Sequence, residues 1–538
     1  MKKIASFNAL NRQNTINNAT SNVFDVIVIG GGITGAGILL DASSRGFNTL
    51  LLEKSDFASG TSSRSTKLIH GGLRYLKNFE FKIVRETGRE RAILHKNAPH
   101  LVIPEKLLIP LTKKGTFKKW QLNWALRIYD ILAKVKGEDK RKMLNKKATL
   151  LHEPIINSKD LIGAGTYAEY RTDDARLTLE IIKTALHFNG TAINYFKVID
   201  INKQNNIYHL TCLDKTTQKQ FEITSKSVVN ATGPWVDNIS QLDLEGSPKR
   251  ICLSKGIHIV IKKEKLPINN SIYFEIEDGR LCFAIPRDKV VYVGTTDTAY
   301  NGKKDEPEIN KGDVNYLLDA LNKTFNKNLK KSDIKSCWSG LRPLIKKEGV
   351  ATKELSRKDE ISISESGMIT IAGGKLTGYR LMAKKIVDLI CRKHNIKKNC
   401  NTENIMINGS SFSDINELNN KISGQLTELE IKDYNANYLI NNYGDQTLTI
   451  LEIYKKNHFK HIAEAEAIFC LKNESLLNPL DFFLRRTGKI YFYPDNVLKE
   501  LEIVMPHFIQ YLSINNQEAE QMKKEVKIYL ENLTKFSE

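Results

Sequence analysis

The sequence lacks the features of an exported or membrane-spanning protein. No run of about eighteen apolar residues occurs, so no transmembrane helix is predicted. Residues 1–22 are polar and Asn-rich and lack the apolar core of a secretory signal, so we interpret them as a flexible tail of a cytoplasmic protein. The seven cysteines, an odd number without a C-x-x-C pair, argue against disulfides and metal sites and favour a reducing compartment.

The chain is long and strongly basic. With 538 residues it exceeds the size of a single core, so we expect two or three domains. Lys and Arg number 81 against 61 Asp and Glu, and this charge of +20 suits an anionic substrate, a nucleic acid or an anionic membrane surface. A genome rich in Lys, Asn and Ile codons would give the same excess. Because no zinc finger, RNP sequence or basic-aromatic stripe occurs, we expect no nucleic-acid partner.

A nucleotide-binding pattern lies near the N-terminus. The β-branched run VIVI predicts a buried strand, and Gly30, Gly32 and Gly35 follow it with G-x-G-x-x-G spacing. A helix that begins there directs free N–H groups and its positive dipole end towards phosphates. A second apolar strand ends at Glu53, where a carboxylate can bind ribose hydroxyls. The alternative is a glycine turn without a ligand, but the combination of elements favours a dinucleotide.

Two later features favour a flavin over a nicotinamide. Hydroxyl side chains crowd residues 59–66, where a nicotinamide enzyme normally continues with alternating strands and helices. Such a loop can wrap the second half of a larger cofactor with hydrogen bonds. A second glycine-opened helix is expected near Lys375, and its positive end suits the N1–C2=O edge of a reduced flavin.

Several segments together carry a family resemblance. They are GGGITGAG, TSSRSTKLIHGGLRYL, NATGPWV, SKGIHIVI, IPRDKVVYVGTTD, SGLRPL and IAGGKLTGYR, spread over residues 23–390, with NPLDFFLRRTGKIYFYP nearer the C-terminus. The sequence resembles the FAD-dependent, quinone-linked glycerol-3-phosphate dehydrogenases of the D-amino-acid-oxidase-like flavoprotein group. The resemblance implies FAD as cofactor, glycerol 3-phosphate as substrate and a membrane quinone as electron acceptor.

The resemblance also implies an α/β fold, α+β overall, with a Rossmann-like FAD-binding domain, a β-sheet substrate domain and a C-terminal helical cap domain. We expect the FAD-binding domain at residues 23–95, 160–245 and 350–395, the substrate domain at 96–159 and 246–349, and the helical domain at 400–538. The motifs and the resemblance together place the following residues at FAD: Gly30, Gly32, Ile33, Thr34, Gly35, Glu53, Lys54, Thr61, Ser62, Ser65, Lys67, Leu68, Gly71, Gly72, Ala231, Thr232, Gly233, Gly374, Lys375, Leu376 and Thr377.

Binding of a phosphate monoester needs at least two cations that hydrogen-bond to its oxygens. Arg is better suited than Lys, because its guanidinium can form two parallel hydrogen bonds to the phosphate. Arg74 and Arg342 are the candidates, and Tyr75 is placed to donate a further hydrogen bond. Lys375 could serve either the substrate or the negative charge of the reduced flavin.

Oxidation of the C2 hydroxyl needs a base, or a cation that stabilises the alkoxide. His70 and His258 are the candidates that titrate near neutral pH. A His within a strand is more often a core group, and Arg342 could act instead by stabilising the alkoxide. The sequence leaves the assignment among these three residues open.

A basic helix is predicted over residues 117–136. Trp120, Trp124, Ile128, Ile131 and Val135 share one helical face, and lysines flank both ends. Such a helix can lie in the headgroup layer of an anionic bilayer, which would place the protein peripherally on the inner face of the membrane. The alternative is a surface helix whose Trp face packs on the substrate domain.

Other functions share these patterns. A glycerol-3-phosphate oxidase would pass electrons to oxygen and make hydrogen peroxide, and the absence of an extra insertion in the substrate domain favours the dehydrogenase. An amino-acid or 2-hydroxy-acid oxidoreductase would use two Arg for a carboxylate, but the SGLRPL and HGGLRY contexts favour phosphate. A flavin-binding regulatory protein would leave the cation cluster unexplained. The sequence leaves the oligomeric state open, and a homodimer is one of the alternatives.

Overall fold

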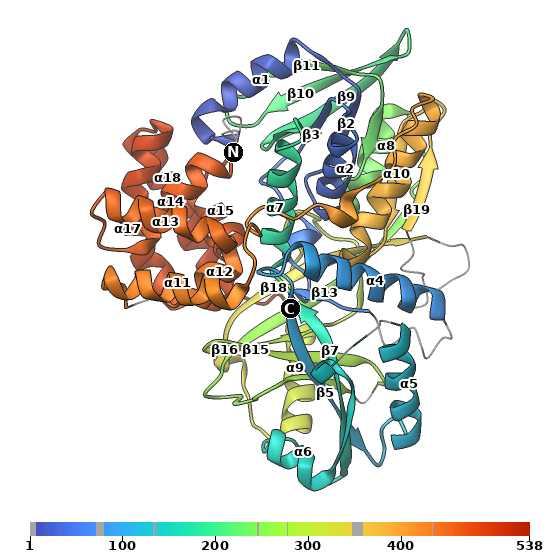
Figure 1. Cartoon of the computed structure of the whole chain (residues 1–538), viewed down its shortest axis with the longest axis vertical. Helices are drawn as coiled ribbons and strands as arrows, with labels where there is room; N and C mark the ends of the chain where they lie inside the picture. Colours follow the sequence, from blue (N-terminus) through green and yellow to red (C-terminus); the bar gives the residue numbers. More distant parts are fainter. Residues whose placement is uncertain are drawn as a thin grey trace.

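The computed structural model describes residues 7–71, 80–132, 135, 137–244, 247–276, 278–346, 359–432 and 434–538. Figure 1 shows a mixed α/β part at the top right, a β-rich part below it and a helical C-terminal part at the left. The predicted fold class, with its β-sheet domain and helical C-terminal domain, is confirmed.

The nucleotide-binding part is built on a six-stranded sheet in the order β19–β20–β12–β2–β3–β8. Its pairings are parallel except for the edge strand β19, which runs antiparallel to β20. The predicted run VIVI is β2, and it is buried on both faces. The strands are β19 (Asp359–Ile363), β20 (Ile369–Gly373), β12 (Val228–Asn230), β2 (Val26–Ile29), β3 (Thr49–Leu52) and β8 (Thr191–Ile193).

Two different layers cover this sheet. Val26 and Val28 pack in one cluster with helices α2 (Ile33–Ser44), α7 (Asp174–Leu186) and α10 (Tyr379–Lys393). Ile27 and Ile29 face the other way, against a four-stranded sheet in the order β1–β11–β10–β9. The alternation follows from the period of two in a strand. The four strands are β1 (Val23–Phe24), β11 (Gln220–Ser225), β10 (Ile207–Asp214) and β9 (Phe196–Gln204).

The lower part is a ten-stranded sheet whose main path runs β17–β13–β16–β15–β14–β5–β7–β4, with β18 paired to β13 and β6 paired to β7. Helices α5 (Lys119–Leu132) and α9 (Lys311–Phe325) pack against it. The strands are β17 (Thr298–Tyr300), β13 (Ile251–Lys262), β16 (Val290–Gly294), β15 (Leu281–Arg287), β14 (Ser271–Glu275), β5 (Ile103–Thr112), β7 (Leu161–Arg171), β4 (Leu68–Ile69), β18 (Ile334–Ile345) and β6 (Lys142–Asn145).

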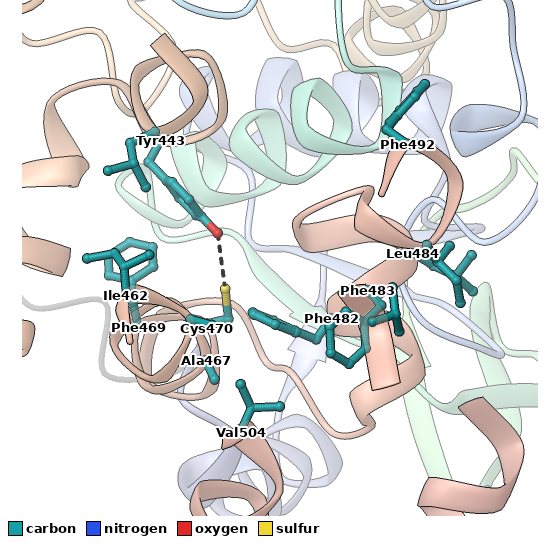
Figure 2. Packing of buried hydrophobic residues seen from close by; sticks show 14 of the residues in the cluster. Tyr443, Ile462, Ala467, Phe469, Cys470, Phe482, Phe483, Leu484, Phe492 and Val504 are labelled. Carbon is teal, nitrogen blue, oxygen red and sulfur yellow. Dashed lines mark hydrogen bonds between the residues drawn. The ribbon is translucent and has the colours of Figure 1, made fainter. Parts of the chain in front are cut away.

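The C-terminal part is helical and has its own core. Figure 2 shows Phe469, Cys470, Phe482, Phe483 and Val504 packed together there, and all five are buried. The elements are α11 (Ile415–Glu428), α12 (Ala436–Tyr443), α13 (Thr447–Lys456), α14 (Ile462–Asn473), α15 (Pro479–Asp481), the π-helical turn η11 (Phe482–Arg486), α16 (Lys489–Phe492), α17 (Pro494–Leu512) and α18 (Asn516–Asn532). The predicted segment NPLDFFLRRTGKIYFYP therefore runs through the middle of this core.

The expected flexible tail is wrong for residues 7–22. This segment contains helix α1 (Arg12–Thr20), and Phe7, Ile16 and Ala19 are buried. The Arg12 guanidinium donates to the Asp214 carboxylate at 2.9 and 3.0 Å, which ties the helix to β10. The polar composition of this segment gave no indication that it packs on the fold. Only a few buried apolar residues and a long-range ion pair hold it in place, and the local sequence does not reveal that pair.

Strand β7 differs from the expected domain division. Residues 161–171 were expected in the FAD-binding domain, but β7 pairs with β5 along almost its whole length and so extends the ten-stranded sheet. Helix α7, which follows directly, returns to the nucleotide-binding part. The chain therefore crosses between the two parts near residue 172.

The basic helix α5 leaves its tryptophans in solvent. Trp120, Trp124 and Ile131 are 63%, 56% and 69% exposed, whereas Leu122 and Leu126 are buried against the sheet. The alternative of a Trp face packed on the substrate domain is therefore wrong. The other two members of the predicted face, Ile128 and Val135, are partly buried. Among the helices that the structure describes, none combines the length and apolar character needed to cross a membrane.

Candidate active site

A cavity of about 850 Å³ lies where β2, β3, β12 and β20 end, at their carboxyl edge. Ligands of open α/β sheets bind at this edge. The predicted residues that line it are Gly30, Gly32, Ile33, Thr34, Glu53, Lys54, Thr61, Ser62, Ser65, Leu68, His70, Ala231, Thr232, Gly233, His258, Arg342, Gly374, Lys375, Leu376 and Thr377. Segments separated by hundreds of residues therefore meet in one place.

The glycine turn requires glycine for steric reasons. Gly30 has φ of +111°, and a Cβ there would lie 2.9 Å from the carbonyl carbon of Ala231. Gly35 does not line the cavity, because it faces the Gly30 carbonyl and lets α2 pack closely on β2. At the start of α2 the Ser62 hydroxyl accepts a hydrogen bond from the Ile33 amide at 2.9 Å. The turn thus has the close approach and helix opening that a pyrophosphate needs.

Glu53 is buried at the end of β3. Its carboxylate accepts from the Gly31 amide at 2.7 Å and from the Ser55 amide at 2.9 Å. Burial raises the pKa of Glu53, and the two backbone donors oppose that rise. The carboxylate lines the cavity with its orientation set by these bonds, as the role of ribose acceptor requires.

The second glycine opening forms another wall of the cavity. Gly373 and Gly374 have φ of +74° and +79°, and a Cβ at Gly374 would meet the sulfur of Met382. One 3-10 turn (Leu376–Gly378) follows before α10 begins. The Thr377 hydroxyl donates to the His70 carbonyl at 3.2 Å and so joins this turn to the chain after β4.

Besides Gly35, two further predicted FAD residues lie away from the cavity, Lys67 and Gly71. Lys67 is buried and pairs with Asp174 at 2.5 Å, so its charge is neutralised within the fold. Gly71 donates its amide to Glu169 at 3.1 Å and lies against the Tyr129 hydroxyl. The local sequence gives no sign of either long-range partner. Gly72, Arg74 and Tyr75 lie outside the described residues and stay predictions.

Arg342 is held by the segment TTD (295–297), which directly follows β16. Its guanidinium donates to the Thr295 hydroxyl at 2.9 Å and to the Thr296 carbonyl at 3.1 Å, and it lies 3.4 Å from the Asp297 carboxylate. Gly256 provides the space, because a Cβ there would lie within 2.7 Å of Nη1 of Arg342. The guanidinium is therefore positioned at the cavity wall before any ligand binds.

His258 lines the same cavity as Arg342. Its Nε2 is 3.0 Å from the Thr66 hydroxyl, and its ring stacks on Trp338 with centroids 4.8 Å apart. Burial lowers the pKa of His258 well below 6.5, and the charges of Arg342 and Lys67 lower it further. His258 is therefore neutral at neutral pH, as a proton acceptor must be. His70 also lines the cavity but is only partly buried.

The sequence analysis missed four residues that line the cavity, namely Arg64, Trp235, Lys304 and Asp305. They lie around Lys54, which was predicted. Lys54 lies over the Trp235 ring, 4.1 Å from its centroid, and pairs with Asp305 at 2.6 Å. Arg64 donates to the Asp305 carbonyl at 2.8 Å. Arg64 and Trp235 belong to quoted motifs, so proximity to those motifs was an available signal. Asp305 and its neighbour Lys304 come from a substrate-domain loop that carries no motif.

The cavity is electropositive. Its charged lining consists of six cations against two carboxylates: Lys54, Arg64, Lys197, Lys304, Arg342 and Lys375, with Glu53 and Asp305. An FAD pyrophosphate fits this balance and the glycine turn, while Glu53 supplies the ribose acceptor. The lining therefore carries an excess of positive charge.

The fold and the cavity define a dinucleotide-binding oxidoreductase of the Rossmann type. Residues 25–380 match the FAD-dependent oxidoreductase family, abbreviated DAO, and the chain belongs to this family. Residues 400–519 match the C-terminal domain of alpha-glycerophosphate oxidase. The predicted family and the predicted cofactor, FAD, are confirmed.

Full-length relatives agree with this assignment. The aerobic glycerol-3-phosphate dehydrogenase of Staphylococcus haemolyticus is 42% identical, and the alignment covers 99% of both chains. The Staphylococcus aureus (strain MRSA252) enzyme of the same name is 42% identical over 96% of this chain and 97% of its own. The alignment with the first relative covers 99% of this chain, so most of residues 1–22 have a counterpart there.

Solved structures show the same architecture. The glycerol-3-phosphate dehydrogenase from Bacillus halodurans, complexed with FAD, superposes with a TM-score of 0.83 at 35% identity, covering 98% of this chain and 99% of its own. An L-alpha-glycerophosphate oxidase from Mycoplasma pneumoniae with FAD bound has a TM-score of 0.56 at 18% identity, covering 70% of this chain and 96% of its own. The second likeness concerns the fold alone.

Proposed function

We propose that this protein oxidises sn-glycerol 3-phosphate to dihydroxyacetone phosphate and passes the electrons to a membrane quinone. The observation that carries the proposal is Arg342, a cation already oriented at the wall of the FAD cavity by three partners. An oriented guanidinium group binds a phosphate monoester well, because it can donate two parallel hydrogen bonds to the phosphate oxygens. The names of the full-length relatives support the same substrate.

Bound FAD would supply the hydride acceptor for the C2 hydrogen. The chain's own residues bind the substrate, orient it and accept the hydroxyl proton. We assign Arg342 to the phosphate or the developing alkoxide, and Lys375 to the same anionic region. Arg74 and Tyr75, which lie outside the described residues, remain predicted partners of the phosphate.

His258 is our proposed base, with His70 as the second candidate. His258 is neutral for the physical reasons given above, and it lines the same cavity as Arg342. A cation in the same cavity also favours the transfer, because it stabilises the negative charge that develops on C2–O as the proton leaves. His258→Asn and His70→Asn variants separate the two candidates, since only loss of the true base should lower kcat with KM little changed.

Helix α5 is the proposed membrane contact. Its exposed Trp120, Trp124 and Ile131 form an apolar edge on a helix whose other side is anchored by Leu122 and Leu126. Lysines precede it in the chain, and Figure 1 shows α5 at the outer side of the lower part. Such an edge can enter the headgroup layer of an anionic membrane while the body of the protein stays in water. A quinone could then reach the flavin from the bilayer.

An anaerobic titration of the purified flavoprotein with glycerol 3-phosphate tests the substrate. Bleaching of the flavin absorbance at stoichiometric substrate is expected, whereas glycerol should have little effect because the phosphate positions C2. Arg342→Gln should lose the response and Arg89→Gln, a substitution at an exposed position, should retain it. An unbleached flavin in the wild-type protein would contradict the proposed substrate.

The electron acceptor is tested separately. Turnover with a soluble quinone analogue under argon should exceed turnover with oxygen alone. Stoichiometric peroxide at a comparable rate would instead identify a glycerol-3-phosphate oxidase, which is the second candidate function.

A further inference from the structure

The segment NPLDFFLRRTGK of the C-terminal part has no role in the proposed reaction. Its two arginines nevertheless reach across to the nucleotide-binding part and meet at Asp56. Arg486 forms a two-point contact with the Asp56 carboxylate, at 2.7 and 2.9 Å, and Arg485 donates to the same carboxylate at 2.8 Å. Asn194 adds a donor at 3.2 Å. All the charged partners are buried.

Asp56 belongs to the loop that shapes the FAD cavity. It stands three residues after Glu53 and directly before Phe57. The Phe57 ring lies against the glycine turn, since a Cβ at Gly31 would be 2.8 Å from its Cδ1. The Ala58 amide donates to the Gly31 carbonyl at 3.0 Å. The position of Asp56 is therefore transmitted directly to the turn that receives the pyrophosphate.

The arginines are held rigidly on their own side. Phe482 and Phe483, which precede them in η11, are buried in the helical core (Figure 2). From the other direction, the N-terminal Phe7 ring packs on Phe57 with centroids 5.5 Å apart, and the Ser475 amide donates to the Phe7 carbonyl at 2.8 Å. Three distant segments of the chain thus close around the loop.

This interface contains a charge-balanced buried network. Burial alone would raise the pKa of Asp56, but Arg486 and Arg485 hold it at about 2. Removal of one member of such a network leaves an uncompensated buried charge, which is strongly unfavourable. The connected members are four carboxylates and four cations: Asp56, Glu180, Glu474 and Asp481, with Arg176, Lys183, Arg485 and Arg486.

We propose that the C-terminal helical domain retains FAD: Arg485 and Arg486 act as positioning residues that fix the loop from Glu53 to Ala58 against the glycine turn. FAD binding and docking of the helical domain are then coupled. Because such coupling is reciprocal, FAD stabilises the docked domain to the same degree as the docked domain tightens FAD binding.

The test measures FAD release from the holoenzyme by the rise in free-flavin fluorescence after dilution. Arg486→Gln should release FAD faster by about 5- to 150-fold, the usual range for coupling between sites. Arg486→Lys, which keeps the charge but not the two-point contact, should give an intermediate rate. The double variant Asp56→Asn with Arg486→Gln removes one charge of each sign and should release FAD more slowly than Arg486→Gln alone.

The matched control is Lys489→Gln. Lys489 is also buried and paired, with Glu466 at 3.0 Å and Glu500 at 2.7 Å, but these partners lie within the helical domain. It should lower Tm while leaving the FAD release rate close to that of wild type. Equal release rates for Arg486→Gln and Lys489→Gln at equal loss of Tm would overturn the proposal, because the network would then serve stability alone.

Reciprocity gives a second readout that does not depend on activity. FAD should slow proteolysis of the C-terminal domain in the wild-type holoenzyme relative to protein stripped of FAD. The protection should shrink in Arg486→Gln. Equal cleavage with and without FAD in the wild-type protein would likewise contradict the coupling.

Discussion

Substitution of Gly256 by Ala should displace Arg342 without changing its chemistry. Gly256 lies in extended backbone within β13, so Ala carries no conformational strain there. Its Cβ would lie 2.7 Å from Nη1 of Arg342 and still closer to Nη2 and to the Thr295 hydroxyl, while ordinary contact begins near 3.4 Å, so the guanidinium must move by about 1 Å. A misplacement of about 1 Å in a positioning group can cost about 100-fold in rate.

We therefore expect kcat/KM on glycerol 3-phosphate to fall by about 10- to 100-fold, equivalent to about 1.4–2.7 kcal/mol of transition-state stabilisation. Steady-state kinetics with a quinone analogue measures this loss, and FAD content should stay at wild-type level. The control is Gly165→Ala, whose Cβ would lie 2.9 Å from Cδ2 of Leu122, away from the cavity. It should lower Tm but retain kcat/KM. If Gly256→Ala kept wild-type kcat/KM while Arg342→Gln lost it, the fixed position of the guanidinium would not matter.

Three further predictions concern FAD, pH and the membrane. Glu53→Gln should weaken FAD binding by roughly 1.5–3 kcal/mol, the usual contribution of a charged hydrogen bond, because the new amide NH₂ would point at a backbone N–H donor. Equilibrium dialysis measures the FAD affinity. An unchanged affinity would exclude Glu53 as a ribose partner. The pKa of His258 is lower in the folded than in the unfolded state, so this residue costs stability as pH falls below 6.5, by up to about 1.4 kcal/mol per pH unit. Tm between about pH 7.5 and 5.5 should therefore fall less in His258→Gln than in wild type, and parallel slopes would contradict a buried neutral imidazole. Trp120→Ser with Trp124→Ser should reduce sedimentation with anionic vesicles, and salt should release part of the wild-type protein because the Debye length shrinks from about 10 Å at 0.1 M to about 3 Å at 1 M. If the double variant sedimented with vesicles as well as the wild-type protein does, α5 would not be the membrane contact.

Short contiguous patterns were sufficient to identify many of the residues that line the cavity. The strand VIVI, the glycine spacing and Glu53 lie within 28 residues, and each is constrained by its immediate neighbours in the chain. The positive φ of Gly30 and the period of two in β2 are local backbone properties, so they can be inferred from the sequence. The motifs around Arg342 and Lys375 were recognisable for the same reason, and both residues line the cavity.

Tertiary structure alone decided the partners of charged and aromatic groups. Lys67 belongs to a predicted cofactor motif, yet it forms a buried ion pair with Asp174. Arg12, in the segment predicted to be a flexible tail, forms an ion pair with Asp214. Arg486 meets Asp56 across 430 positions of the chain. Local patterns cannot specify such pairs, because a side chain's partner depends on which elements the completed fold brings together. The exposure of Trp120 has the same origin: helical periodicity defines a face, and only packing against neighbouring elements decides which face is buried.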